Sequence, residues 1–168
     1  FKAWTHQYAT APLYLDRYDA FQQTLIQAKD SSSTETNEMM WEFLNDKNKN
    51  IRMLALYSHK LISEADSAEL REKVIDMMLN APSSSVRTAA IFVMTKLKAS
   101  QENNYAVRKT LKDSSYMVKA NGLEALYVMD KEFVLKKTEE FEDSNNSSLV
   151  NSLSRIYANE GKAEYQSY

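Results

Sequence analysis

The sequence predicts an all-α fold, an α-α superhelix of about four to five helix pairs. Three observations predict it. The chain of 168 residues holds only two glycines and two prolines, the residues that the turns of β-sheets need most. Apolar residues recur with the 3.6-residue period of a helix. A basic residue followed three places later by a small one also returns along the chain at nearly constant intervals.

This basic–small pattern marks the first helix of each predicted pair. Its members are Arg17 with Ala20, Arg52 with Ala55, Arg87 with Ala90, and Lys119 with Gly122, at intervals of 35, 35 and 32 residues. A fainter fifth unit keeps apolar spacing at Val150, Leu153 and Tyr157, with Asn151 and Ser154 at the places of the basic and small residues. Repeats of this length are typical of helical arrays in which each pair covers the apolar face of the next.

Apolar spacing and capping residues place the helices in order. After a first helix around Arg17, the expected helices cover Glu35–Asn45, residues 51–62, Ser67–Asn80, Val86–Leu97, Gln101–Leu111, Val118–Met129 and Lys131–Phe141. The predicted N-terminal caps are Ser32, Asp66 and Asp130. Pro82 stands just past the third of these helices, where a helix has to stop.

The repeated residues are predicted to serve structure. Small side chains at Ala20, Ala55, Ala90 and Gly122 allow neighbouring helix axes to approach to about 8–10 Å. Asp46 and Asp113 each stand five places before the first apolar residue of their helix, and we expect them to pair with Arg52 and Lys119. In the third repeat this place is taken by Ala81. The alternative is that Arg52 and Arg87 line a binding surface.

No catalytic, cofactor-binding or metal-binding residue is predicted. The chain has no cysteine, and its two histidines, His6 and His59, are 53 residues apart, outside any zinc-ligand spacing. We expect both histidines to pack at helix boundaries. No serine stands in a nucleophile motif, and the two glycines are isolated, so no phosphate-binding loop is present in the sequence.

The charge balance argues against a nucleic-acid partner. The net charge is −2, and the one basic cluster is expected to be a solvated face; it comprises Arg108, Lys109, Lys112 and Lys119, with Lys96 and Lys98 nearby. The longest apolar run, AAIFVM at 89–94, is too short to cross a bilayer. The lack of cysteine leaves the cellular compartment undecided.

Helix pairs of about 32 to 35 residues that carry an acid, Val or Ile, Arg, two residues and Ala resemble HEAT-like repeats, over Asp16 to about Tyr157. The segment WTHQYATAPLYLDRYDA, residues 4–20, resembles the entry to the C-terminal helical domain of bacterial zinc metallopeptidases of the aminopeptidase N family. The HExxH motif of that family is absent, because QYAT follows His6 and KLIS follows His59. The chain opens with Phe1, so we expect residues 1–168 to be one HEAT-like domain cut from a longer protein.

The resemblance implies a non-catalytic C-terminal module of a larger zinc-dependent aminopeptidase-like protein. Such a module would shape the substrate chamber or make protein contacts, and the zinc would belong to the catalytic domain of the parent chain. The implied partners are the other domains of that parent and a peptide substrate; the compartment is left undecided, with a setting outside the cytoplasm of a bacterium as one alternative. The alternative is a stand-alone HEAT-like scaffold for protein–protein interaction.

Overall fold

The computed structural model describes residues 7–28 and 33–161. In these two stretches the backbone forms α-helices, short 3-10 helices and turns, and no strand. The all-α prediction is confirmed to that extent. The chain divides into two compact units, Phe1–Val74 and Ile75–Tyr168, and the division falls inside helix α5, Ser67–Asn80.

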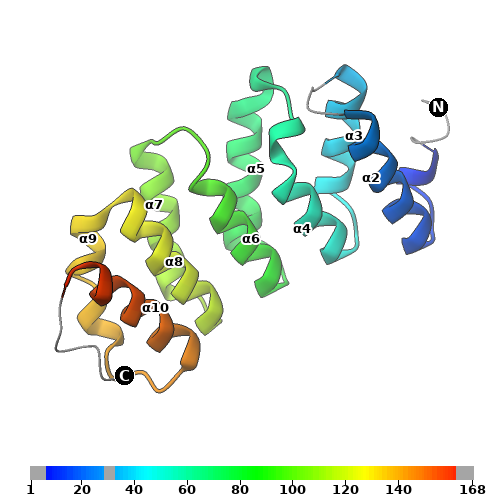
Figure 1. Cartoon of the computed structure of the whole chain (residues 1–168). Helices are drawn as coiled ribbons and strands as arrows, with labels where there is room; N and C mark the ends of the chain where they lie inside the picture. The colour runs from blue at the N-terminus through cyan, green and yellow to red at the C-terminus, as the bar shows by residue number, and fades with distance from the viewer. Residues whose placement is uncertain (1–6, 29–32, 162–168) are drawn as a thin grey trace. The chain divides into compact units, whose positions relative to one another are not determined.

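The first unit is built from α2 (Tyr14–Ala28), α3 (Thr34–Leu44) and α4 (Lys49–Tyr57), followed by the 3-10 helices η1 (His59–Leu61) and η2 (Glu64–Asp66). Helix α3 packs on both α2 and α4, and α2 also contacts α4 (Figure 1). Phe21 meets Phe43 edge to face in this core, with ring centroids 5.2 Å apart. The other large buried side chains here are Met40, Leu44, Ile51 and Leu56.

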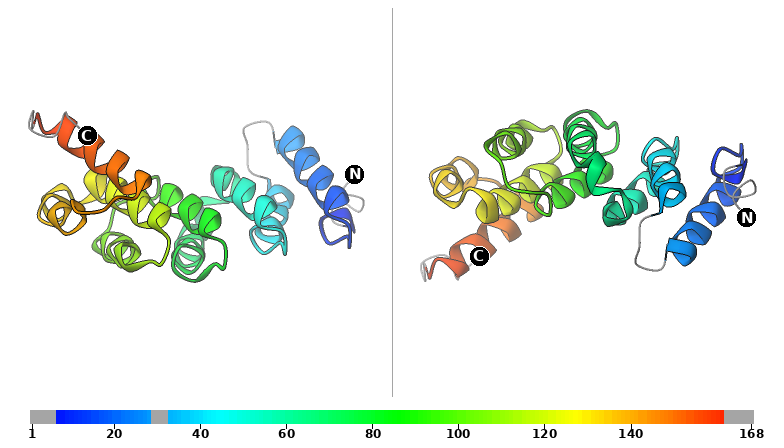
Figure 2. Two further views of the ribbon diagram at one scale, coloured as in Figure 1. Left: turned by 90° about the horizontal axis from the view of Figure 1, so that it is seen from below. Right: turned by 90° about the horizontal axis from the view of Figure 1, so that it is seen from above.

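The second unit is organised around α8 (Tyr116–Met129). It also contains α6 (Ser84–Met94), α7 (Gln101–Lys109), η3 (Thr110–Lys112), α9 (Lys131–Leu135), η4 (Thr138–Phe141) and α10 (Ser147–Asn159). Helix α8 lies between α6 and α10 and also contacts α7 and α9 (Figure 2). The large buried side chains of the second unit include Ile91 and Met94 of α6, Leu123 and Leu126 of α8, and Leu149 of α10. Consecutive antiparallel helices thus share one core within the unit.

Several helices end where a side chain binds a carbonyl of the last turn. The hydroxyls of Thr95, Thr110 and Thr138 donate to carbonyls three residues earlier, those of Phe92, Val107 and Leu135 at 2.7, 2.6 and 3.0 Å. In the same way Nδ1 of His59 lies 3.0 Å from the Leu56 carbonyl. These side chains compete with the helical ladder for carbonyls, so they end helices without glycine.

Four predicted helices are therefore shorter at their C-terminal ends than the apolar spacing indicated, and the one predicted over Val86–Leu97 ends at Met94. The helix predicted over 51–62 ends at Tyr57 and continues as η1. The helix predicted over Gln101–Leu111 ends at Lys109, and the one over Lys131–Phe141 breaks into α9 and η4. Apolar periodicity continues through a 3-10 turn, so it does not reveal where the α-helical ladder stops.

Of the predicted N-terminal caps, Asp130 does stand at the N-cap position of α9, whereas α3 is capped by a different residue from the one predicted. Ser33 caps α3, its Oγ accepting the Thr36 N–H at 3.1 Å, while Ser32 lies outside the described residues. The Asp66 carboxylate accepts instead from Asn37 Nδ2 of α3, at 2.6 Å. Asp130 makes no capping hydrogen bond with its side chain and pairs with Arg108 of α7. The carboxylates of these two acids thus bind side chains of another helix, and the local sequence does not reveal that contact.

The register of the repeat is set by the N-cap residues Asn48, Ser83, Ser115 and Asn146. The residue four places after each cap donates its N–H to the cap carbonyl, and these residues are Arg52, Arg87, Lys119 and Val150. The fifth unit was therefore predicted one residue too late. Val150, not Asn151, holds the basic position, and Leu153, not Ser154, holds the small one.

Candidate functional site

Arg17 and Asp46 form a buried ion pair in the first unit. Nε and Nη2 of Arg17 donate to the two carboxylate oxygens of Asp46 at 2.6 and 3.2 Å. Nη1 of Arg17 donates to the carbonyls of Ala11 and Pro12 at 2.9 and 3.0 Å, and Asp46 also accepts the Asn48 N–H at 2.6 Å. The two side chains are 5% and 3% exposed. Each charge is thus compensated and hydrogen-bonded, which a buried ion pair requires.

Arg87 and Asp113 repeat this arrangement in the second unit. Nε and Nη2 of Arg87 donate to the Asp113 carboxylate at 2.7 and 2.9 Å. Nη1 donates to the carbonyls of Ala81 and Pro82 at 2.8 and 3.3 Å, and Asp113 accepts the Ser115 N–H at 2.7 Å. The same arginine and aspartate atoms therefore make the same bonds in both units. In each case the arginine joins its own helix to the linker before that helix and to the linker that follows the next helix.

Arg52 makes only half of these bonds. Its Nη1 donates to the carbonyls of Asp46 and Lys47 at 2.6 and 3.1 Å. The predicted pairing between Arg52 and the Asp46 carboxylate is replaced by the one with Arg17. An arginine four places after its N-cap donates to the carbonyls five and six residues before it. The carboxylate of the linker instead binds the arginine of an earlier helix, α2 in the case of Asp46.

Lys119, like Arg52, does not bind the carboxylate with which the sequence pairs it. The Asp113 carboxylate, its predicted partner, is bound by Arg87. The Lys119 ammonium lies 5.2 Å from the ring centroid of Tyr116 and acts on Asp113 only through its charge. An ammonium lacks the fork that lets a guanidinium bind a carboxylate and two carbonyls together.

The small residues of the repeat are buried where helices touch. Ala20, Ala55 and Ala90 are 0% exposed. A Cβ added at Gly122 would lie 2.2 Å from Oγ1 of Thr110, far inside van der Waals contact. Gly122 therefore has no room for even a methyl group beside Thr110, which is itself buried.

The Asp113 pair predicts a pH dependence of stability. Burial alone would raise the pKa of Asp113, but the hydrogen bonds from Arg87 and the Ser115 N–H, with the charges of Arg87 and Lys119, hold the pKa below its ordinary 3.8. The unfolded-state pKa is then the higher, so this stabilisation is present above about pH 4 and is lost as pH falls through the folded pKa.

We expect Asp113→Asn to remove that contribution. Urea unfolding followed by far-UV circular dichroism between pH 3 and 7 would measure it. The gap in unfolding free energy between the native chain and the variant should be widest near neutral pH and narrow towards pH 3. A gap that stays constant over this range would contradict the assignment.

Neither histidine is part of the two ion pairs, one of them standing at a helix end and the other outside the part of the chain that the structure describes. His59 is 8% exposed, packed at the end of α4 as predicted, and His6 lies outside the described residues. Among residues 7–28 and 33–161 no three His, Asp or Glu side chains are grouped to hold a metal ion. No helix in that part of the chain is both long and apolar enough to span a membrane.

The basic cluster is spread over aromatic rings. Arg108 pairs with Asp130 and stacks 4.0 Å from the Phe133 centroid. Lys109 lies 4.7 Å from the Tyr105 centroid, and Lys96 and Lys119 lie over Phe92 and Tyr116. Four of the six cations, Lys96, Lys98, Lys109 and Lys112, are exposed, and Arg108 and Lys119 are half-buried, so most of the cluster is solvated, as predicted.

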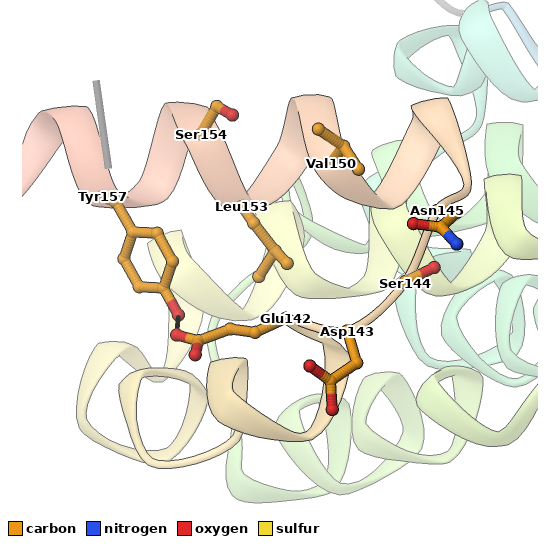
Figure 3. A pocket seen from close by; sticks show the side chains of 8 residues that line it. All are labelled: Glu142, Asp143, Ser144, Asn145, Val150, Leu153, Ser154 and Tyr157. Atoms are coloured by element: carbon orange, nitrogen blue, oxygen red, sulfur yellow. Dashed lines mark hydrogen bonds between the residues drawn. The ribbon is translucent and has the colours of Figure 1, made fainter. Parts of the chain in front are cut away.

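A hollow of about 440 Å³ lies beside α10 in the second unit (Figure 3). Its lining residues are Glu142, Asp143, Ser144, Asn145, Val150, Leu153, Ser154 and Tyr157. The Tyr157 hydroxyl donates to the Glu142 carboxylate, and no described residue donates a hydrogen bond to the Asp143 carboxylate. The hollow combines an apolar wall with an acidic edge, and we take it as the candidate binding site.

The sequence alone does not indicate this hollow. Its acidic residues were visible as a run after Phe141, and its apolar residues as a stripe in the fifth unit. The fifth unit was placed one residue late, so the replacement of the arginine by Val150 was not apparent.

Comparison of the chain with protein-family models, with curated proteins and with solved structures finds no match. The resemblance of residues 4–20 to aminopeptidase N enzymes stays a prediction, and Trp4 lies outside the described residues.

Proposed function

We propose that this chain is a non-catalytic helical-repeat module whose helix pairs stack as a HEAT-like solenoid and whose role is to contact other polypeptides. The observation that carries the proposal is the twofold occurrence of one joint, Arg17 with Asp46 and Arg87 with Asp113, between consecutive helix pairs. A helix pair cannot enclose a core alone, so a repeated joint between pairs is what a solenoid requires.

The charged residues of these joints support a structural rather than a catalytic role. The carboxylates of Asp46 and Asp113 are occupied by guanidinium groups and backbone N–H groups at 3.2 Å or less. Catalytic acids and bases need a proton exchange site open to substrate. Both oxygens of each of these carboxylates already accept hydrogen bonds from the protein itself.

The setting that we infer is the C-terminal module of a larger zinc-dependent aminopeptidase-like protein. The segment at residues 4–20 supports this, together with the repeat that follows it. In that setting the module would wall the substrate chamber, peptides would pass along it, and zinc would belong to the catalytic domain of the parent.

A stand-alone scaffold is the second candidate, and exposed aromatic residues favour it. Phe92, Tyr105 and Tyr116 in the second unit are 46%, 62% and 50% exposed. Aromatic residues of this kind, tyrosine above all, are enriched at protein interfaces, where they offer a large contact area at low entropic cost.

Two measurements test the proposal. The purified chain of residues 1–168 should hydrolyse neither alanyl- nor leucyl-p-nitroanilide, with or without added zinc. Hydrolysis that a chelator abolishes would overturn the non-catalytic assignment. The reading frame upstream of the segment then separates the two settings, since an HExxH motif followed by a downstream glutamate identifies the peptidase parent and its absence leaves the scaffold.

A further inference from the structure

The hollow beside α10 is lined by Val150, which holds the sequence position that an arginine holds in other units. Arg17, Arg52 and Arg87 all donate through Nη1 to the carbonyls six and five residues before them. Val150 stands at this position in the fifth unit, so the corresponding carbonyls belong to Ser144 and Asn145. All three residues line the hollow in Figure 3.

Val150 has no donor group for the carbonyls of Ser144 and Asn145. The described residues donate no hydrogen bond to the carbonyls of Ser144 or Asn145. Their equivalents receive a guanidinium in each of the three arginine units. A valine side chain ends at its Cγ atoms, whereas an arginine side chain continues to the guanidinium. The space that a guanidinium would take beside α10 is therefore left open.

The hollow supplies the negative charge that a guanidinium needs. In two of the three arginine units a carboxylate also binds the guanidinium, Asp46 for Arg17 and Asp113 for Arg87. In the hollow beside α10 the carboxylates of Glu142 and Asp143 lie on the same linker as the two carbonyls. Leu153 and Val150 form an apolar wall on which the aliphatic stem of a long cationic side chain can rest.

We propose that this hollow binds an arginine side chain of a partner polypeptide, whose guanidinium takes the place that Arg17, Arg52 and Arg87 hold in their own units. The proposal rests on the proposed function, the contact with other polypeptides, and it specifies which side chain of the partner polypeptide is bound at this site. Arginine fits better than lysine because its planar fork donates to two carbonyls and a carboxylate at once. A volume of about 440 Å³ is within the range of small-ligand pockets.

The test is a titration of the ¹⁵N-labelled chain with the blocked peptide acetyl-Ala-Arg-Ala-amide, followed by NMR. We expect saturable shifts confined to residues 142–146 and 150–157, with a millimolar dissociation constant, as suits one side chain. The same peptide with lysine should bind at least about threefold more weakly, and with the neutral isostere citrulline it should not shift these residues. Equal binding of the citrulline peptide, or shifts elsewhere only, would overturn the proposal.

Two variants sharpen the test. Val150→Arg supplies the guanidinium from α10 itself, so the peptide should bind at least about tenfold more weakly while the helical spectrum is retained. Val128→Arg is the matched control, because it makes the same change at a position of α8 that is 76% exposed and outside the hollow, and it should leave binding unchanged. Asp143→Asn, at an exposed residue, should weaken binding and reduce its salt dependence. Undiminished binding to Val150→Arg would refute the site.

Failure of this site and failure of the proposed function give different results. If an arginine-bearing protein partner binds the native chain and the Val150→Arg chain equally well, the site is wrong and the protein-contact role stands. If the peptide titration succeeds but the purified chain shows chelator-sensitive peptidase activity, the non-catalytic role is wrong and the arginine site stands.

Discussion

Replacing Arg17 by methionine is expected to lower the unfolding free energy of the first unit by about 3–5 kcal/mol. The Asp46 side chain is 3% exposed, so loss of the guanidinium leaves a carboxylate buried without its counter-charge. The carbonyls of Ala11 and Pro12 lose their donor as well. Urea unfolding followed by tryptophan fluorescence would measure the loss, because Trp41 belongs to this unit.

Arg52→Met is the matched control for this prediction. Arg52 makes the same bonds to linker carbonyls but holds no carboxylate, so its removal should cost only about 0.5–1.5 kcal/mol per hydrogen bond lost. The double variant Arg17→Met/Asp46→Asn should be more stable than Arg17→Met alone, because an asparagine carries no charge to bury and still accepts the Asn48 N–H. Equal losses at Arg17 and Arg52 would show that the carboxylate contributes nothing.

Gly122→Ala is expected to destabilise the second unit by about 1–3 kcal/mol. The sign is the informative part, since glycine to alanine in an unobstructed helix stabilises by about 1 kcal/mol. Here the new Cβ would meet the Thr110 hydroxyl at 2.2 Å. That hydroxyl cannot turn away freely, because it donates to the Val107 carbonyl at 2.6 Å. Far-UV circular dichroism during urea unfolding would measure the change.

The steric origin of this effect can be isolated with Thr110→Ala, which removes the obstructing hydroxyl. In that background Gly122→Ala should become neutral or stabilising, so the two substitutions should be strongly non-additive. Asn121→Ala, one residue away on α8 and only half-buried, serves as the control and should cost much less. If Gly122→Ala stabilises the native chain, the close approach of α8 to the end of α7 is not as described.

Local sequence predicted the helices and their buried faces because those depend on spacing within a single segment. Ile51, Val86 and Val118 were placed on buried stripes from periodicity alone, and all three are 0% exposed. Helix ends were less predictable, since Thr138 and His59 end helices through single hydrogen bonds that leave the apolar period unbroken.

The partners of the linker acids required the tertiary structure. From the sequence, Asp46 was assigned to Arg52, six residues away, but its carboxylate binds Arg17, 29 residues earlier. The Asp66 carboxylate binds Asn37 of α3, and Asp130, although it stands at the N-cap position of α9, binds Arg108 of α7 with its carboxylate. The sequence shows only how far apart two residues are along the chain, and this distance favours the nearest basic residue as the partner of each aspartate.

The sequence by itself determined that this protein is helical over the described residues, which positions of its helices are buried, and that a basic residue followed by a small one returns along the chain. Those properties follow from propensity and period, which act over a few residues. Only the tertiary structure decided which acid meets which arginine, where glycine is indispensable, and that Val150 leaves an arginine place open beside α10. These depend on how closely one helix approaches the next, which is a property of packing between segments distant in sequence.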